Sequence, residues 1–191
     1  HVGDTVRLPV TGRSIMLAVD LSGSMQTPDM RSGSDAVSRL TAVKAVAGDF
    51  IQRRVGDRLG LILFGDQAYL QAPLTFDRKT VLTLLDEAQI GLAGQQTAIG
   101  DAIGLAIKRL RADPAQAQHD GDTVLILLTD GQNTAGAMPP LNAAKLAADS
   151  KLRVYTIGVG APVEAGFFGS SGNTDLDEDT LTTVASILSG L

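Results

Sequence analysis

The sequence predicts an α/β fold in which helices cover both faces of a mostly parallel β-sheet. Short apolar runs alternate with segments whose apolar residues recur at helical spacing, the pattern of α/β proteins. The run at residues 124–128 contains only Val, Leu and Ile, so we expect a central parallel strand buried on both faces. Gly65-Asp66 separates two other strand-like runs and is a hairpin signal. These observations together predict a doubly wound, Rossmann-like sheet with one antiparallel edge strand.

Length and composition indicate one globular domain over residues 1–191, with a core from about residue 13 to 189. The chain has 191 residues, of which 44% are hydrophobic and 19% charged, so disorder of the bulk is excluded. It has no Cys, which excludes disulfides and thiolate metal sites. A net charge of −5 argues against nucleic acid as a partner. No apolar run approaches the ~18 residues of a membrane span.

The N-terminal half predicts a strand, a helix and a hairpin. Residues 15–20 form an apolar run and are expected to be a buried strand, followed by a polar loop over residues 21–38. Helical spacing then predicts a helix that ends near Arg54. The next strand is expected over residues 59–64, and residues 67–74 should return antiparallel to it. The apolar face of this first helix consists of Leu40, Val43, Ala47, Phe50 and Ile51.

The middle of the chain predicts two helices and the most apolar strand. The first helix is expected from about Asp77 to Ala88. A Gly/Gln-rich loop then leads to Thr97, which is placed like the N-cap of the second helix. Residues 123–129 are the expected central strand. The apolar stripe of the second helix consists of Ile99, Ala102, Ile103, Ala106 and Leu110.

The C-terminal part predicts a helix, a strand and a final helix. Pro140 is a favourable first-turn residue for a helix that ends near Asp149. A fifth strand is expected over residues 153–159, followed by a Gly/Ser-rich loop over residues 160–174. The last helix should begin near Asp177.

Polar side chains follow two strands that this fold would place side by side. The first strand ends in Asp20-Leu21-Ser22-Gly23-Ser24, and the central strand ends in Thr129-Asp130-Gly131. Ligands of open α/β sheets bind at the carboxyl ends of the strands, where the winding reverses. If these two strands are neighbours, Asp20 and Asp130 meet there, and Thr97 begins a helix between them in sequence.

Two carboxylates and three hydroxyls form a set of hard oxygen donors. Such a set suits Mg²⁺, with Mn²⁺ or Ca²⁺ as alternatives, rather than zinc or copper. Five donors giving one oxygen each leave at least one of six positions open, which would attract a carboxylate from outside. Each piece alone has a plainer explanation: a polar turn for Asp20, Ser22 and Ser24, a helix cap for Thr97, and a turn pair for Asp130-Gly131.

In these residues the chain resembles von Willebrand factor type A domains with a complete metal-ion-dependent adhesion site (MIDAS). The matching motif is Asp-x-Ser-x-Ser at Asp20, Ser22 and Ser24, followed by Thr97 and then Asp130. Within that family the chain is most similar to bacterial Bat-type (aerotolerance operon) membrane proteins. The stretches that carry this likeness are residues 15–25, 72–75, 97–101 and 154–160.

The resemblance implies a magnesium-binding protein-interaction domain in the bacterial inner membrane, on the periplasmic side. It implies membrane attachment through flanking helices outside this chain. The implied partners are a protein that supplies a Glu or Asp to the metal, other Bat-type proteins, and a MoxR-type AAA+ ATPase. Because the chain starts at His1 without Met, we expect a processed or excised piece. Since relatives continue into a further edge strand, we expect one exposed sheet edge here.

Apolar residues in the loops near this site are candidates for partner contact. Met25, Met30 and Met138 lie in such loops, and Phe167 and Phe168 lie in the expected loop after the fifth strand. Adaptable Met and aromatic side chains suit an interaction surface. Two alternatives stay open for the Phe pair: a small core under the loop, or a disordered loop. Three further acidic residues are expected to be solvated: Asp29, Asp35 and Asp66.

The rival function is a metal-dependent phosphohydrolase or phosphotransferase on the same kind of sheet. The second acidic position of an Asp-x-Asp nucleophile motif is Ser22 in this chain. The sequence contains no phosphate-binding Gly-x-x-x-x-Gly-Lys-[Ser/Thr] loop, no Gly-x-Gly-x-x-Gly turn after the first strand and no Gly-x-Ser-x-Gly elbow. The two His residues, His1 and His119, are not placed to act as a base for either serine. We therefore expect a binding domain and not an enzyme.

Overall fold

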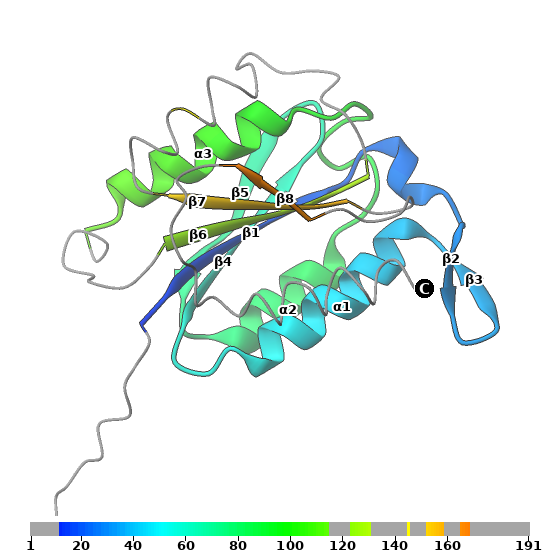
Figure 1. Ribbon diagram of the computed structural model, residues 1–191, viewed down its shortest axis with the longest axis horizontal. Coiled ribbons are helices and arrows are strands. Elements are labelled where there is room, and N and C mark those ends of the chain that lie inside the picture. Colours follow the sequence, from blue (N-terminus) through cyan, green and yellow to red (C-terminus); the bar gives the residue numbers. More distant parts are fainter. Residues whose placement is uncertain (1–11, 115–122, 131–144, 146–151, 159–164, 169–191) are drawn as a thin grey trace, which may run out of the picture.

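The computed structural model describes residues 12–114, 123–130, 145, 152–158 and 165–168, and within them the α/β prediction is confirmed. A six-stranded sheet has the order β5-β4-β1-β6-β7-β8 (Figure 1). Its strands are β1 (Ser14–Asp20), β4 (Arg58–Phe64), β5 (Ala68–Thr75), β6 (Thr123–Thr129), β7 (Arg153–Gly158) and β8 (Ala165–Phe168). The described helices are α1 (Arg39–Arg53), α2 (Arg78–Glu87) and α3 (Ile99–Ala112).

The helices lie on both faces of the sheet, as predicted. Figure 1 shows α1 and α2 on one face and α3 on the other. Alternate residues of β1 divide between the two cores: Ile15 packs with the α1 and α2 side, and Met16 packs with the α3 side. All seven residues of β1 are buried, which explains why residues 15–19 are apolar on both faces of the strand.

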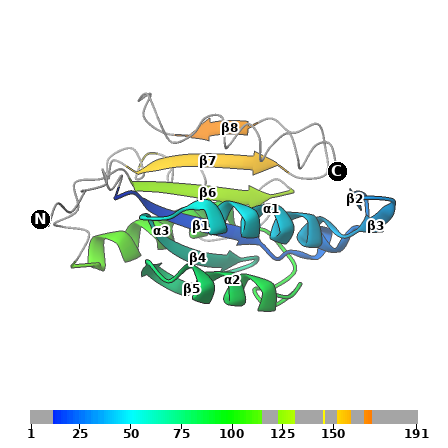
Figure 2. The ribbon, with the colours of Figure 1, turned by 90° about the horizontal axis from the view of Figure 1, so that it is seen from below.

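Strand directions follow the prediction at the centre of the sheet and add to it at one edge. β1 is parallel to both β4 and β6, and β6 is parallel to β7. β5 is the expected antiparallel edge strand. At the other edge, β8 pairs antiparallel with β7 in a segment for which a loop was predicted, so β8 is the edge strand of the described sheet (Figure 2). Local composition does not show that these two segments pair with each other.

The predicted polar loop over residues 21–38 is also more ordered than expected. It contains a short 3-10 helix, η1 (Gly23–Gln26), and a hairpin of β2 (Met30–Ser32) and β3 (Asp35–Val37). Gly33 occupies the hairpin turn with a φ of 64°, a conformation that favours glycine. Figure 2 shows this hairpin at the end of the molecule to which the arrows of β6 and β7 point.

One predicted helix start is wrong, and two predicted helices cannot be compared. The N-cap of α3 is Ala98 and not Thr97, and no side chain caps this helix. The predicted helices over residues 140–149 and from residue 177 lie outside the described residues, except Lys145, which is helical.

Helix α2 is held at both ends by side chains. Asp77 is its N-cap and accepts hydrogen bonds from the backbone N–H and the hydroxyl of Thr80. At the other end, Lys44 of α1 donates to the carbonyl oxygens of Asp86 and Ala88. These contacts satisfy backbone groups that a helix end leaves without intrahelical partners.

We expect Asp77→Ala to lower the free energy of unfolding near neutral pH. The hydrogen bonds from Thr80 lower the pKa of Asp77 below its ordinary value of 3.8. Its stabilising contribution is therefore present above about pH 3.8 and is lost as the pH falls through the lowered pKa of the folded state. Urea unfolding at neutral pH and below pH 3.8 checks this, because the difference in free energy of unfolding between wild type and variant should be smaller in acid. Asp77→Asn keeps an acceptor that does not titrate and is the control. A difference independent of pH would contradict the prediction.

Candidate metal centre

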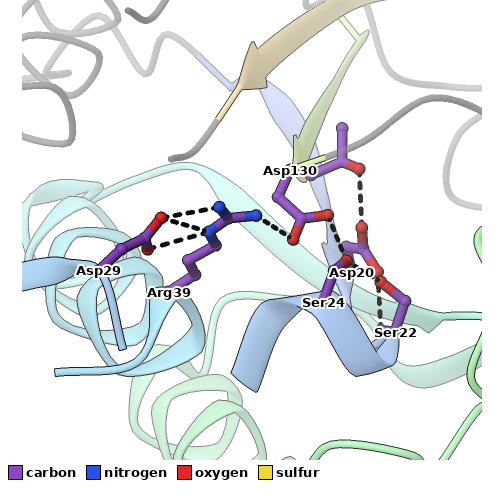
Figure 3. Close-up of polar contacts among 7 residues, drawn as sticks. Asp20, Ser22, Ser24, Asp29, Arg39 and Asp130 are labelled. Carbon is purple, nitrogen blue, oxygen red and sulfur yellow. Dashed lines mark hydrogen bonds and ion pairs between the residues drawn. The ribbon is translucent and has the colours of Figure 1, made fainter. Parts of the chain in front are cut away.

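Four of the five predicted site residues, Asp20, Ser22, Ser24 and Asp130, gather at the carboxyl ends of β1 and β6. These strands are parallel neighbours, with Val19 opposite Leu128, so Asp20 and Asp130 emerge at the same edge of the sheet. The adjacency that the sequence argument required is therefore present. Figure 3 shows both carboxylates facing Ser22, which precedes η1, and Ser24, which lies in η1.

Asp20 is a fully buried carboxylate held by two donors. Its Oδ1 accepts from the backbone N–H of Ser22 at 2.8 Å, and its Oδ2 accepts from Oγ1 of Thr129 at 2.7 Å. Burial raises the pKa of Asp20, and the charge of Asp130 adds to this, while the hydrogen bonds from Ser22 and Thr129 act in the opposite direction. The carboxylate is thus fixed in position by β6 on one side and by the turn after β1 on the other.

The two serines connect Asp20 to Asp130. Ser22 is buried and extended, and the chain then turns into η1, which brings Ser24 to the exposed rim. The hydroxyl oxygens of Ser22 and Ser24 are 3.2 Å apart, and Ser24 donates to Oδ1 of Asp130 at 2.9 Å. A continuous set of oxygen atoms from four side chains therefore lines this edge (Figure 3).

Thr97 is buried in a loop whose backbone is tied to the same edge. Gly23 N–H donates to Gln95 O at 3.1 Å, and Ala98 N–H donates to Gly65 O at 2.7 Å. Asp66 is exposed, as expected, and accepts from Gln96 N–H at 2.6 Å. The residues on both sides of Thr97 are thus hydrogen-bonded to Gly23, in the turn after β1, and to Gly65 and Asp66, after β4.

A charged pair that the sequence analysis did not single out adjoins the site. Arg39, the first residue of α1, donates from Nη1 to Oδ2 of Asp130 at 2.9 Å (Figure 3). The guanidinium also contacts both carboxylate oxygens of Asp29, which is exposed, as expected, and paired with Arg39. The hydrogen bonds from Arg39 lower the pKa of Asp29, and the same contacts raise the pKa of Arg39. No local pattern marks an Arg in a first helical turn as part of a site.

The donor chemistry fits a hard divalent cation. Asp20, Ser22, Ser24 and Asp130 present only oxygen atoms, and Thr97 adds a hydroxyl from the adjoining loop. No three residues of the types His, Cys, Asp and Glu gather in the part of the chain that the structure describes. The residues present thus match the oxygen ligands that Mg²⁺, Mn²⁺ and Ca²⁺ take, with hydroxyls outnumbering carboxylates.

In the part of the chain that the structure describes, the residues predicted to contact a partner lie in η1 and in strands rather than in loops. Met25 was expected at the surface, but it is fully buried in the core on the α1 side, and Met30 is buried as well. Its placement in η1 turns Met25 inward, which a loop prediction does not capture. Met138 lies outside the described residues. Phe167 and Phe168 lie in β8 rather than in a loop. An apolar residue that the sequence analysis missed, Leu92, is 60% exposed in the loop that leads to Thr97.

A Rossmann-like sheet with Asp-x-Ser-x-Ser after its first strand, joined at the same edge by a Thr loop and a second Asp, defines the MIDAS-type α/β interaction domain. The sequence matches the von Willebrand factor type A domain family over residues 14–187. The chain therefore belongs to this family, whose MIDAS binds a divalent metal and whose members are generally interaction modules.

Solved structures similar to this chain include bacterial membrane proteins. An uncharacterized membrane-spanning protein from Vibrio fischeri is 48% identical, over 93% of this chain and 87% of that one, with a TM-score of 0.51. An aerotolerance-related membrane protein from Bacteroides fragilis is 29% identical, over 92% of this chain and 88% of that one, with a TM-score of 0.68. Proximal thread matrix protein 1 from the mussel byssus shares the fold at 22% identity over 91% of this chain and 45% of that one (TM-score 0.64), and its MIDAS motif is occupied by zinc.

The chain spans about half the length of the curated relatives it matches, between 42% and 56% of each. One of them, an uncharacterized protein of Borreliella burgdorferi, is 28% identical over 80% of this chain. Within the residues described, no helix has the length and hydropathy needed to cross a membrane.

We expect Gly65→Ala to destabilise the metal-free protein by about 1–3 kcal/mol, the cost of overpacking a closed contact. A Cβ at Gly65 would lie 2.6 Å from Ala93 O and 2.8 Å from Gly94 O, so the loop that leads to Thr97 would have to move. Gly48→Ala in α1 is the matched control, because its Cβ would meet only Leu82 Cδ2, at 3.5 Å.

Chemical unfolding in the presence of a chelator measures both variants. The control should be neutral or more stable by about 0.5–1 kcal/mol, since Ala replaces Gly inside a helix. Equal stability of the two variants would show that the contact between Gly65 and the loop is not closed in solution.

Proposed function

We propose that this chain is a metal-dependent protein-interaction domain that captures an acidic residue of a partner. In this proposal Ser22, Ser24 and Thr97 hold a divalent cation through their hydroxyl oxygens. Asp20 and Asp130 ligate it directly or through water and orient the hydroxyls. The observation that carries the proposal is the chain of contacts of 2.7–3.2 Å that links Thr129, Asp20, the serines and Asp130 at one sheet edge.

Mg²⁺ is the proposed cation, with Mn²⁺ and Ca²⁺ as alternatives. Mg²⁺ takes about six oxygens in octahedral geometry and keeps some of its water. Five side chains that each give one oxygen leave at least one position for a ligand from outside the chain. A Glu or Asp of a partner has the charge and the hard oxygen to fill it. Because two carboxylates only balance the charge of a divalent ion, an added carboxylate is not repelled by a surplus of negative charge.

The membrane-protein relatives support a setting at the bacterial inner membrane. We propose that segments outside this chain anchor the domain there, with the domain on the periplasmic side. Other Bat-type proteins and a MoxR-type ATPase are the partners that the family resemblance suggests. The net charge of −5 supports a protein partner rather than nucleic acid.

Calorimetric titration of Mg²⁺, Mn²⁺, Ca²⁺ and Zn²⁺ into chelator-stripped protein tests the metal site. We expect saturable one-site binding by the wild type and none by Asp20→Ala. Ser24→Ala changes an exposed residue and should weaken binding, because it removes one of the proposed oxygen ligands. Asp49→Ala, which removes an exposed carboxylate paired with Arg53 on α1, is the matched control and should bind like wild type.

Two outcomes would contradict this assignment. Equal binding by wild type and Asp20→Ala would place the metal elsewhere in the chain. Metal-dependent turnover of p-nitrophenyl phosphate, abolished by Asp20→Ala, would favour the phosphohydrolase alternative over the binding domain. Circular dichroism of each variant in chelator shows whether it is folded, so that loss of binding is not confused with loss of structure.

Capture of a carboxylate is tested with immobilised domain and a library of glutamate-containing peptides. We expect peptides retained in Mg²⁺ to be released by chelator and to be lost when the glutamate is replaced by glutamine. Retention that survives both changes would mean that the domain binds peptides without a metal bridge.

A further inference from the structure

Arg39 forms an ion pair with one of the two carboxylate oxygens of Asp130, a residue of the candidate metal centre. Its Nη1 donates to Oδ2 at 2.9 Å, while Oδ1 of the same carboxylate accepts from Ser24. The Asp130 side chain is 1% exposed and that of Arg39 is 19% exposed, so solvent screens the contact only in part. A cation bound at the serines would therefore share Asp130 with a second positive charge that the chain itself supplies.

Arg39 is held in this position by its backbone and by two carboxylates. The backbone N–H of Arg39 donates to Thr27 O at 3.0 Å, which ties the start of α1 to the chain that follows η1. Asp29 accepts from Nε at 3.0 Å and from Nη2 at 2.7 Å, a paired geometry that fixes the plane of the guanidinium. With Asp130 on Nη1, rotation of the side chain away from the site would break contacts with two carboxylates.

The charges of these residues set the field at the site. Asp20 and Asp130 together carry two negative charges, and Arg39 offsets one of them. Asp29 offsets part of the charge of Arg39 from the far side. A divalent cation here is thus less neutralised than two carboxylates alone would make it.

We infer that Arg39 competes with a bound cation for the carboxylate of Asp130. It thereby weakens cation binding and leaves the charge of the bound cation less neutralised, which favours capture of a partner's carboxylate. Asp29 moderates this effect by sharing the guanidinium. The inference rests on the proposed function, because it concerns the same site, and it assigns the control of metal and partner affinity to two residues that are not ligands.

The test measures Mg²⁺ affinity by calorimetry for the wild type, Arg39→Met, Asp29→Asn and the double variant. We expect Arg39→Met to bind Mg²⁺ about fivefold more tightly, the scale of a partly exposed ion pair, and Asp29→Asn to bind it more weakly. Because Asp29 is argued to act through Arg39, the double variant should bind like Arg39→Met. Arg53→Met is the matched control, since Arg53 forms an exposed pair with Asp49 on the same helix.

Each outcome decides the matter. Unchanged or weaker binding by Arg39→Met overturns the inference and indicates that Arg39 only positions Asp130. An effect of Asp29→Asn that persists without Arg39 overturns the role given to Asp29. Retention of the glutamate peptides by Mg²⁺-loaded Arg39→Met should fall, and unchanged retention overturns the link to partner capture.

If Arg39→Met does not fold, Asp29→Asn, a change at an exposed residue, still tests the inference, because an unaltered Mg²⁺ affinity of that variant overturns it. Absence of Mg²⁺ binding by the wild type defeats the proposed function itself, whereas wild-type binding with unchanged variants defeats only the inference.

Discussion

The buried carboxylate of Asp20 is the constraint on which the rest of the site depends. A buried charge is costly unless hydrogen bonds or a counter-ion compensate it. Here Thr129 donates from β6 and the backbone of Ser22 donates from the turn after β1. The contact from Thr129 exists only because β1 and β6 are parallel neighbours in register, whereas the contact from Ser22 is local to the turn. The same contacts direct the turn that carries the serines, so the pairing of two strands, one buried acid and the placement of the hydroxyls form one connected arrangement.

Rigid support for this arrangement comes from the layers around β1. Each residue of β1 is buried, and its two faces pack into separate cores under α1 with α2 and under α3. Close-packed strands hold their ends more precisely than loops do, which suits ligands that must converge on one ion. The loop of Thr97 is packed against Gly65 and is also held by hydrogen bonds to Gly65 and Asp66 after β4 and to Gly23 at the start of η1.

The fold and the site differ in how far the sequence could predict them. Buried strands and amphipathic helices have a periodic hydrophobic pattern, so β1, β4, β5 and β6 and helices α1 to α3 lie within a few residues of their predicted places. The charged residues around the site have no such pattern and could not be predicted. Arg39 and Asp130 are 91 residues apart in sequence, and nothing near either one indicates that they meet. Met25 was misjudged for a related reason: its side chain direction is set by η1, a turn without periodic pattern.

By itself, the sequence determined the class of fold and the antiparallel edge strand after Gly65, and it predicted the residues of the candidate metal centre. It could do so because hydrophobic spacing and a short polar motif are local properties of the chain. Only the tertiary structure decided that β8 covers the edge of β7, that Asp29 and Arg39 join the site, and that Met25 belongs to the core. Those features depend on which distant segments come into contact, and contact between distant segments is a property of packing rather than of any stretch of sequence.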